Sequence, residues 1–155
     1  MLQRLVADRL MHPRSGTAFA VTPTLREAYA EGDDDELADV ALREAALASL
    51  RLLAGEGTSD LPLRRAVVVA EVEGATARPD LDDAVVRLSA PIAFTDVIAV
   101  YVDNADAEQA VVPAIEAVDA ADLGDEDAEF IVGDAQDHDL AWYAAQEVPF
   151  LIELL

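Results

Sequence analysis

Residues with catalytic or metal-binding potential gather in the segment DAQDHDLAWYAAQE near the carboxyl end, which holds one of the two histidines and the single tryptophan. On a helix, Asp134 and His138 would share one face and form a carboxylate–imidazole pair. A catalytic metal needs about three convergent protein ligands, and Asp137 and Asp139 would point elsewhere on the same helix. We therefore interpret His138 as lying at the rim of an apolar stripe, packed on Trp142 and hydrogen-bonded to Asp134. We predict no catalytic residue, no metal and no cofactor.

The acidic segment DLGDEDAEF has alternating carboxylates, at Asp125, Asp127 and Glu129, that could suggest calcium ligands. An EF-hand loop, however, requires a glycine at the sixth position and a glutamate at the twelfth. Counted from Asp125, those positions hold Phe130 and Gln136. We therefore interpret this cluster as the acidic first turn of a helix.

Other catalytic patterns are missing from the sequence. Cysteine is absent, which excludes disulfides and thiolate chemistry. No serine lies in a nucleophile-elbow pattern, and no glycine-rich segment has the Lys-Ser/Thr continuation of a phosphate loop. Arg64 and Arg65 stand directly before a predicted strand, where they fit gatekeepers of an edge strand better than a phosphate contact.

The composition indicates one folded domain over residues 1–155. The chain is 53% hydrophobic and has a formal net charge of -22. Its length suffices to bury a single core, and its apolar share is too high for a disordered chain.

Arg4, Asp8 and Arg9 interrupt the first residues, so we predict no signal peptide. No window approaches the roughly 18 apolar residues of a membrane span, and we expect a cytoplasmic protein without membrane contact.

Charge is distributed unevenly along the chain. All ten cations are arginines between Arg4 and Arg87, whereas residues 88–155 contain 16 of the 32 acids and no cation. This half is either a solvated acidic face or a docking surface for a basic protein. The negative charge opposes direct binding of nucleic acid or of an anionic membrane. The predicted acidic interaction face consists of Asp125, Glu126, Asp127, Glu129, Asp134, Asp137 and Asp139.

Hydrophobic periodicity and turn signals predict an α+β fold, with a small, mostly antiparallel or mixed sheet of about four strands and five or six helices. Strands are expected at residues 17–22, 66–72, 84–89 and 97–102. The second should be central in the sheet, and the polar segment GATARPDLDD should be a loop before the third. Helices are expected from residue 2 to before His12, and over 23–29, 33–54, 104–118 and 128–145. Pro113 should kink or split the fourth helix.

The segments TAFAVTPTLREAYAEGDDDEL, AVVVAEV, VIAVYVDNADAEQAV and DAADLGDEDAEF, with HDLAWYAAQE, resemble a family of small acidic actinobacterial proteins of unknown function. The resemblance covers nearly the whole chain and implies a cytosolic protein without an assigned activity. Family members open with a short strand of the form R-V-Y-V-P, whereas Met1 here already stands inside the first predicted helix. If that strand is missing, an exposed sheet edge could form a homodimer.

The order of elements through VRLSAPIAFTDVIAVYV also resembles ADP-ribosyltransferase-like folds, a resemblance of layout alone. Three hypotheses about function follow. The leading one is a non-enzymatic protein that acts through protein contacts of the acidic face. The second is a degenerate transferase-like, nucleotide-binding domain or enzyme, with a pocket formed by Thr22, Arg26, Tyr29, His138 and Trp142. The third is an acidic nucleic-acid mimic, whose capture by a basic groove would depend strongly on salt.

Overall fold

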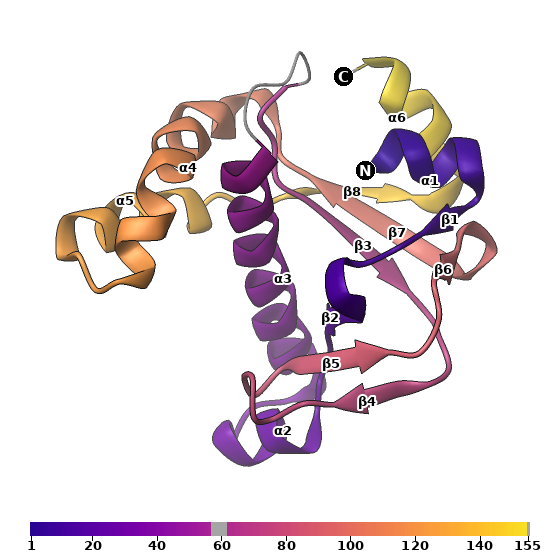
Figure 1. The fold of residues 1–155 in the computed structure, drawn as a ribbon, viewed down its shortest axis with the longest axis horizontal. Helices are drawn as coiled ribbons and strands as arrows, with labels where there is room; N and C mark the ends of the chain where they lie inside the picture. Colours follow the sequence, from indigo (N-terminus) through magenta and orange to yellow (C-terminus); the bar gives the residue numbers. More distant parts are fainter. Residues whose placement is uncertain (57–61, 155) are drawn as a thin grey trace. The chain divides into compact units, whose positions relative to one another are not determined.

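The computed structural model describes residues 1–56 and 62–154 (Figure 1). They group into two compact units: unit 1, Met1–Ala45 with Val69–Ile98, and unit 2, Ala46–Val68 with Ala99–Leu155. Three elements contribute residues to both units: α3 (Asp34–Glu56), β3 (Ala66–Ala70) and β7 (Val97–Val102). The described residues form six α-helices and three small sheets, which confirms the predicted α+β class. The single domain over residues 1–155 stays a prediction.

Unit 1 contains two small antiparallel sheets. Strand β1 (Leu10–Met11) pairs with β6 (Ile92–Ala93), while β5 (Val85–Leu88) pairs on its two sides with β2 (Thr17–Phe19) and β4 (Ala75–Ala77). The helical elements of the unit are α1 (Leu2–Asp8), η1 (Arg14–Gly16), α2 (Pro23–Ala28), the first part of α3 and η2 (Phe94–Asp96). The strands predicted at 17–22 and 84–89 are therefore confirmed, in shorter form.

Two capped helices position the core of unit 1. Helix α2 begins after Thr22, its N-cap, whose Oγ1 accepts a hydrogen bond from the Leu25 amide at 3.0 Å and donates one to the Asp83 carbonyl. Helix α3 begins after Asp33, whose Oδ1 accepts a hydrogen bond from the Glu36 amide at 2.8 Å, as the capping-box spacing predicts. The apolar core consists of Leu25, Leu37 and Ala84 with Phe19, Val21 and Val40.

Unit 2 contains a three-stranded sheet in the order β3, β7, β8 (Ala141–Ala144). Strands β7 and β8 are antiparallel, with Val100 opposite Tyr143, and Val100 is fully buried. The other elements are the second part of α3, η3 (Ala105–Ala107), α4 (Glu108–Asp122), α5 (Glu126–Gln136), η4 (Ala145–Glu147) and α6 (Val148–Leu154). The strand predicted at 97–102 is thus confirmed as an interior strand.

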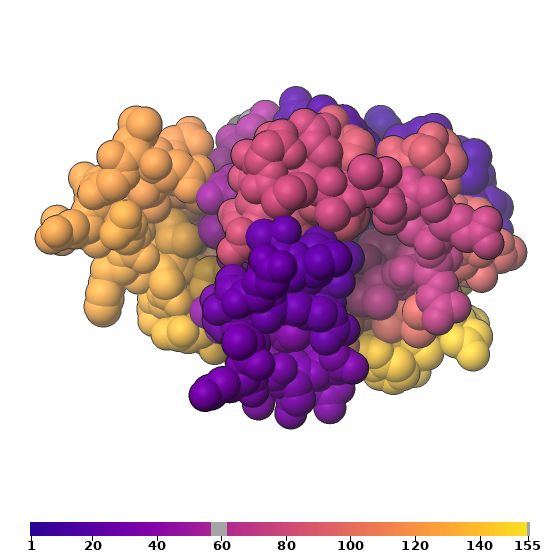
Figure 2. Space-filling model, turned by 90° about the horizontal axis from the view of Figure 1, so that it is seen from below, coloured from indigo at the N-terminus to yellow at the C-terminus, as the bar shows by residue number. Residues whose placement is uncertain are grey.

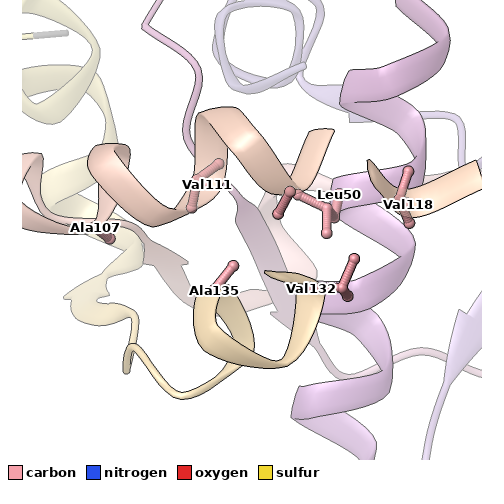
Figure 3. Packing of buried hydrophobic residues seen from close by; sticks show 7 residues of the cluster. Leu50, Ala107, Val111, Val118, Val132 and Ala135 are labelled. Atoms are coloured by element: carbon pink, nitrogen blue, oxygen red, sulfur yellow. The ribbon is translucent and has the colours of Figure 1, made fainter. Parts of the chain in front are cut away.

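Helices α4 and α5 pack as a hairpin against the end of α3 that belongs to unit 2. Small side chains dominate this cluster, which Figure 3 shows: Leu50, Ala107, Val111, Ala114, Val118, Val132 and Ala135. Alanine and valine bring the helix backbones close together, and close packing maximises dispersion contacts. The buried face of α5 is therefore held rigidly against α4 and α3, and the opposite face of α5 points away from this core.

A glycine turn joins the two helices of the hairpin. Gly124 has φ +95°, and its amide donates to the Ala121 carbonyl at 3.0 Å. The Asp125 amide donates to the Ala120 carbonyl at 3.1 Å, which completes a Schellman arrangement at the end of α4. Asp125 then caps α5, because its Oδ1 accepts a hydrogen bond from the Ala128 amide at 2.9 Å.

Three predictions in the first part of the chain are wrong in detail. The first helix ends at Asp8, Arg9 adopts φ 59°, and Leu10–Met11 form a strand instead. The segment GATARPDLDD is not wholly a loop, because Ala75–Ala77 form β4. Strand β3 lies at an edge of its sheet, and β7 occupies the centre. In each case, pairing with residues distant in sequence decides the outcome.

The predicted helix over 128–145 is wrong beyond Gln136. Helix α5 ends there, and Ala141–Ala144 form a strand that pairs with β7. Aromatic residues favour strands, and β7 offers backbone partners that local periodicity does not reveal. Of the kink or split expected at Pro113, the split does not occur, because α4 is continuous through this residue. Proline there removes only one helical N–H, which would have bonded to the Gln109 carbonyl.

Candidate protein-interaction surface

The predicted acidic interaction face lies on α5 and the turns at its two ends, and α5 is visible in orange at the surface in Figure 2. All seven carboxylate residues are exposed: Asp125, Glu126, Asp127, Glu129, Asp134, Asp137 and Asp139. Four of them occupy the cap and first turn of α5, where negative charge stabilises the amino-terminal end of a helix. Helix capping therefore explains part of the cluster, and it leaves the acids of the last turn and beyond without a local role.

Large apolar side chains are exposed among these carboxylates. Their exposed fractions are 89% for Leu123, 80% for Phe130 and 38% for Ile131. Helix α5 buries its small residues against the hairpin core, so the Phe130 ring projects from the remaining surface. Helical spacing places Asp127 about one turn before Phe130 and Asp134 about one turn after it. An exposed aromatic ring is therefore flanked on both sides by carboxylates.

The acidic interaction face is not neutralised from within the described chain. None of its seven carboxylates lies within ion-pair distance of an arginine among residues 1–56 and 62–154. The acids of unit 2 that do form ion pairs lie outside this face: Asp122 pairs with Arg51, Glu108 with Arg64 and Asp103 with Arg65. A dense set of unpaired carboxylates produces a strong negative local potential.

A buried ion pair supports the segment between α5 and β8. The Arg65 and Asp103 side chains are both fully buried, and Nε and Nη2 of Arg65 donate to the two Asp103 carboxylate oxygens at 3.0 and 2.7 Å. The Arg65 amide also donates to Asp103 Oδ2 at 2.7 Å. Further bonds reach Gln136 Oε1 at 2.9 Å and the His138 carbonyl at 2.8 Å. Arg65 is therefore a buried structural residue, and its predicted role as an edge-strand gatekeeper is wrong.

The sequence matches DUF6912, a family of unknown function, over residues 1–152. The chain belongs to this family. The family resemblance predicted from the sequence is thus confirmed at the level of a domain of unknown function. No curated protein and no solved structure matches the chain. Any function proposed for this DUF6912 chain therefore rests on its own geometry.

The proposed nucleotide pocket divides between the two units of this DUF6912 chain. In unit 1, Thr22 is buried as the cap of α2, Arg26 pairs with Asp34 at 2.6 Å, and Tyr29 is half exposed. His138 and Trp142 belong to unit 2. Neither unit therefore contains all five residues.

The predicted environment of His138 is also wrong. His138 is exposed in the turn after α5, and its side chain forms no hydrogen bond with Asp134. Trp142 lies on β8 opposite Tyr101 and is 57% exposed, so a shared helix face with His138 does not exist. The reason is that α5 ends at Gln136, before either residue.

The described part of this DUF6912 chain contains neither a metal-binding cluster nor a membrane-spanning helix. Over residues 1–56 and 62–154, no three His, Cys, Asp or Glu side chains cluster in a way that could hold a metal ion. Across the same residues, no helix combines the length and the apolar character needed to cross a membrane. The best candidate for a functional site among the described residues is therefore the acidic interaction face with its exposed aromatic ring.

Proposed function

We propose that this DUF6912 chain acts through protein contacts and binds a basic protein partner with its acidic interaction face. The observation that carries the proposal is the exposed Phe130 ring among seven unpaired carboxylates. Unpaired carboxylates attract a cationic surface over several ångströms and raise the association rate. A well-placed aromatic side chain supplies the apolar contact that slows dissociation.

The spacing of these residues defines the chemistry of the partner. Asp127 and Asp134 lie about one helical turn to each side of Phe130. A complementary surface would present lysine or arginine side chains on both sides of an apolar patch. An amphipathic basic helix meets this requirement, because its cations and apolar residues alternate with the same helical period.

A nucleic-acid mimic uses the same carboxylates in a different way. Such a mimic would substitute for phosphates in a basic groove, and its binding would come from charge alone. Phe130 and Leu123 have no counterpart in a phosphate backbone, and their exposure favours a partner with apolar side chains. The two mechanisms therefore differ in how much binding depends on the Phe130 ring.

The proposal is tested with a defined probe, a synthetic amphipathic helical peptide of lysine and leucine, by fluorescence anisotropy at several salt concentrations. Phe130→Ala should weaken binding by about tenfold, the effect of losing roughly 1.4 kcal/mol of apolar contact. Its melting temperature should barely change, because truncation of an exposed side chain costs within about 0.5 kcal/mol.

Matched charge variants separate a local site from the general negative charge. Asp127→Asn with Asp134→Asn removes two charges beside Phe130, whereas Asp35→Asn with Asp39→Asn removes two exposed charges from α3. We expect the first pair to weaken binding and to make the affinity fall less steeply with salt, because fewer charged contacts remain to be screened, and the second pair to have little effect. Equal effects of the two pairs would contradict the proposal. Unchanged binding by Phe130→Ala, with a steep salt dependence, would favour the nucleic-acid mimic instead.

A further inference from the structure

A shallow pocket of about 220 Å³ lies on the three-stranded sheet of unit 1, far in sequence from the acidic interaction face. Its lining residues are Gly74, Thr76, Arg78, Arg87, Leu88 and Ser89. The antiparallel register of β4 and β5 places Thr76 opposite Arg87, and the Ser89 amide donates to the Gly74 carbonyl at 3.2 Å. Alternate residues of a strand share one face, so two arginines and two hydroxyl groups gather on the same side of this sheet.

Arg87 has unused hydrogen-bond donors beside the pocket. Its Nη1 donates to the Ser15 carbonyl at 2.8 Å. Among residues 1–56 and 62–154, its Nε is the only buried side-chain nitrogen or oxygen without a hydrogen-bond partner. No carboxylate among these residues forms an ion pair with Arg87. In so acidic a chain, an arginine without an ion-pair partner is a candidate ligand for an external anion.

The second arginine of the pocket is held in place. Nε and Nη2 of Arg78 donate to the two carboxylate oxygens of Asp80 at 2.9 and 2.8 Å, which leaves Nη1 available. The hydroxyl groups of Thr76 and Ser89 form no hydrogen bond within the described chain. The pocket therefore offers guanidinium and hydroxyl donors from both strands.

A glycine makes room for one of these hydroxyl groups. Gly74 has φ +77°, and a Cβ atom added there would lie 2.2 Å from Ser89 Oγ. Any larger residue would displace the serine hydroxyl and would also be strained in this left-handed conformation. Glycine at this position is thus consistent with a hydroxyl group placed at the edge of the pocket.

We propose that this pocket binds the phosphate group of a phosphate monoester or inorganic phosphate. The lining residues of the pocket include two guanidinium groups and no carboxylate, and a doubly charged oxyanion gains most from contact with both arginines. Guanidinium N–H groups form paired hydrogen bonds to phosphate oxygens, and hydroxyl donors can satisfy the remaining oxygens. The large negative charge of the whole chain opposes long-range attraction, so binding depends on these short-range contacts.

The test is an amide NMR titration of the full chain with inorganic phosphate at constant ionic strength. We expect saturable shifts confined to residues 74–89, and Arg87→Gln should raise the Kd by about tenfold or more, as for loss of a charge-assisted contact. Arg4→Gln is the matched control, because it removes the same charge from an exposed residue of α1. Shifts that do not saturate, or an equal effect of Arg4→Gln, would overturn the proposal.

A second variant keeps the test decisive if Arg87→Gln does not fold. Thr76→Val preserves the shape and strand preference of an exposed residue while removing one hydroxyl donor. It should raise the phosphate Kd without altering the melting temperature. A parallel titration with acetate separates ligand classes, because a planar carboxylate can use fewer of these donors than a tetrahedral phosphate. Acetate binding as tight as phosphate binding would overturn the assignment to phosphate.

Discussion

The Arg65–Asp103 pair provides the sharpest test of how unit 2 is held together. The Asp103 carboxylate accepts three hydrogen bonds from Arg65, and both side chains are fully buried. Asp103→Asn preserves the size of the side chain but removes the charge, and it turns one acceptor into a donor that faces the guanidinium. An arginine cannot lose its proton at ordinary pH, so an uncompensated charge would remain in the interior.

The size of the effect follows from this burial. Removing one partner of a buried ion pair costs about 3–5 kcal/mol of unfolding free energy. For a chain of this length, about 1 kcal/mol lowers Tm by roughly 3 °C, so the expected decrease is on the order of 9–15 °C. Differential scanning calorimetry gives Tm, and urea unfolding gives the free energy directly.

The neighbouring pair in sequence is a built-in control. Arg64 and Glu108 are joined at 2.8 Å, but their side chains remain 23% and 38% exposed. Glu108→Gln should therefore cost below about 1 kcal/mol, because solvent screens a partly exposed pair. An Asp103→Asn cost as small as that of Glu108→Gln would refute the reasoning, since it would show that burial adds nothing to this pair.

A double variant distinguishes the energy of the pair from the cost of an unpaired charge. Arg65→Met with Asp103→Leu removes both charges and fills the space with apolar groups. It should be more stable than Asp103→Asn alone, because replacement of a buried ion pair by apolar residues is often neutral. A double variant less stable than the single one would show that the bonds to Gln136 and the His138 carbonyl dominate.

Two further predictions concern the hairpin turn and the phosphate pocket. Gly124→Ala should lower the free energy of unfolding by about 1–2 kcal/mol, because Gly124 has a positive φ that alanine adopts with strain. Gly133→Ala should raise it by about 0.5–1 kcal/mol, because Gly133 lies in a helix with ordinary φ. Neither position crowds an added Cβ atom. Urea unfolding measures both changes, and two changes of the same sign would contradict the proposed conformations. The hydrogen bond from Arg78 lowers the pKa of Asp80, so Arg78→Gln should raise that pKa toward the ordinary value of an aspartate in an NMR titration. The stabilisation due to ionised Asp80 is present above the ordinary pKa of an aspartate and is lost as pH falls through the lowered pKa of the folded state. An unchanged pKa in the variant would disprove the link.

Local sequence signals were sufficient to predict several features of the structure. Asp33 and Asp125 are helix caps in the structure, as their spacing from the following residues predicts. The exposed acids of α5 are also readable from the sequence, because seven carboxylates without a nearby cation cannot all be buried. Such features depend on neighbours within about one helical turn, and they are therefore determined before the chain folds on itself.

Tertiary structure alone decided the rest. Residues 141–144 keep a helical apolar spacing in the sequence, yet pairing with β7 makes them a strand and separates Trp142 from His138. The sequence alone predicts a surface position for Arg65. Its burial is stable because Asp103, 38 residues away in sequence, pairs with it. The same holds for the pocket of Arg78 and Arg87, which are brought together by the register of β4 and β5. Contacts between residues distant in sequence contribute much of the folding free energy here, and no local sequence pattern predicts them.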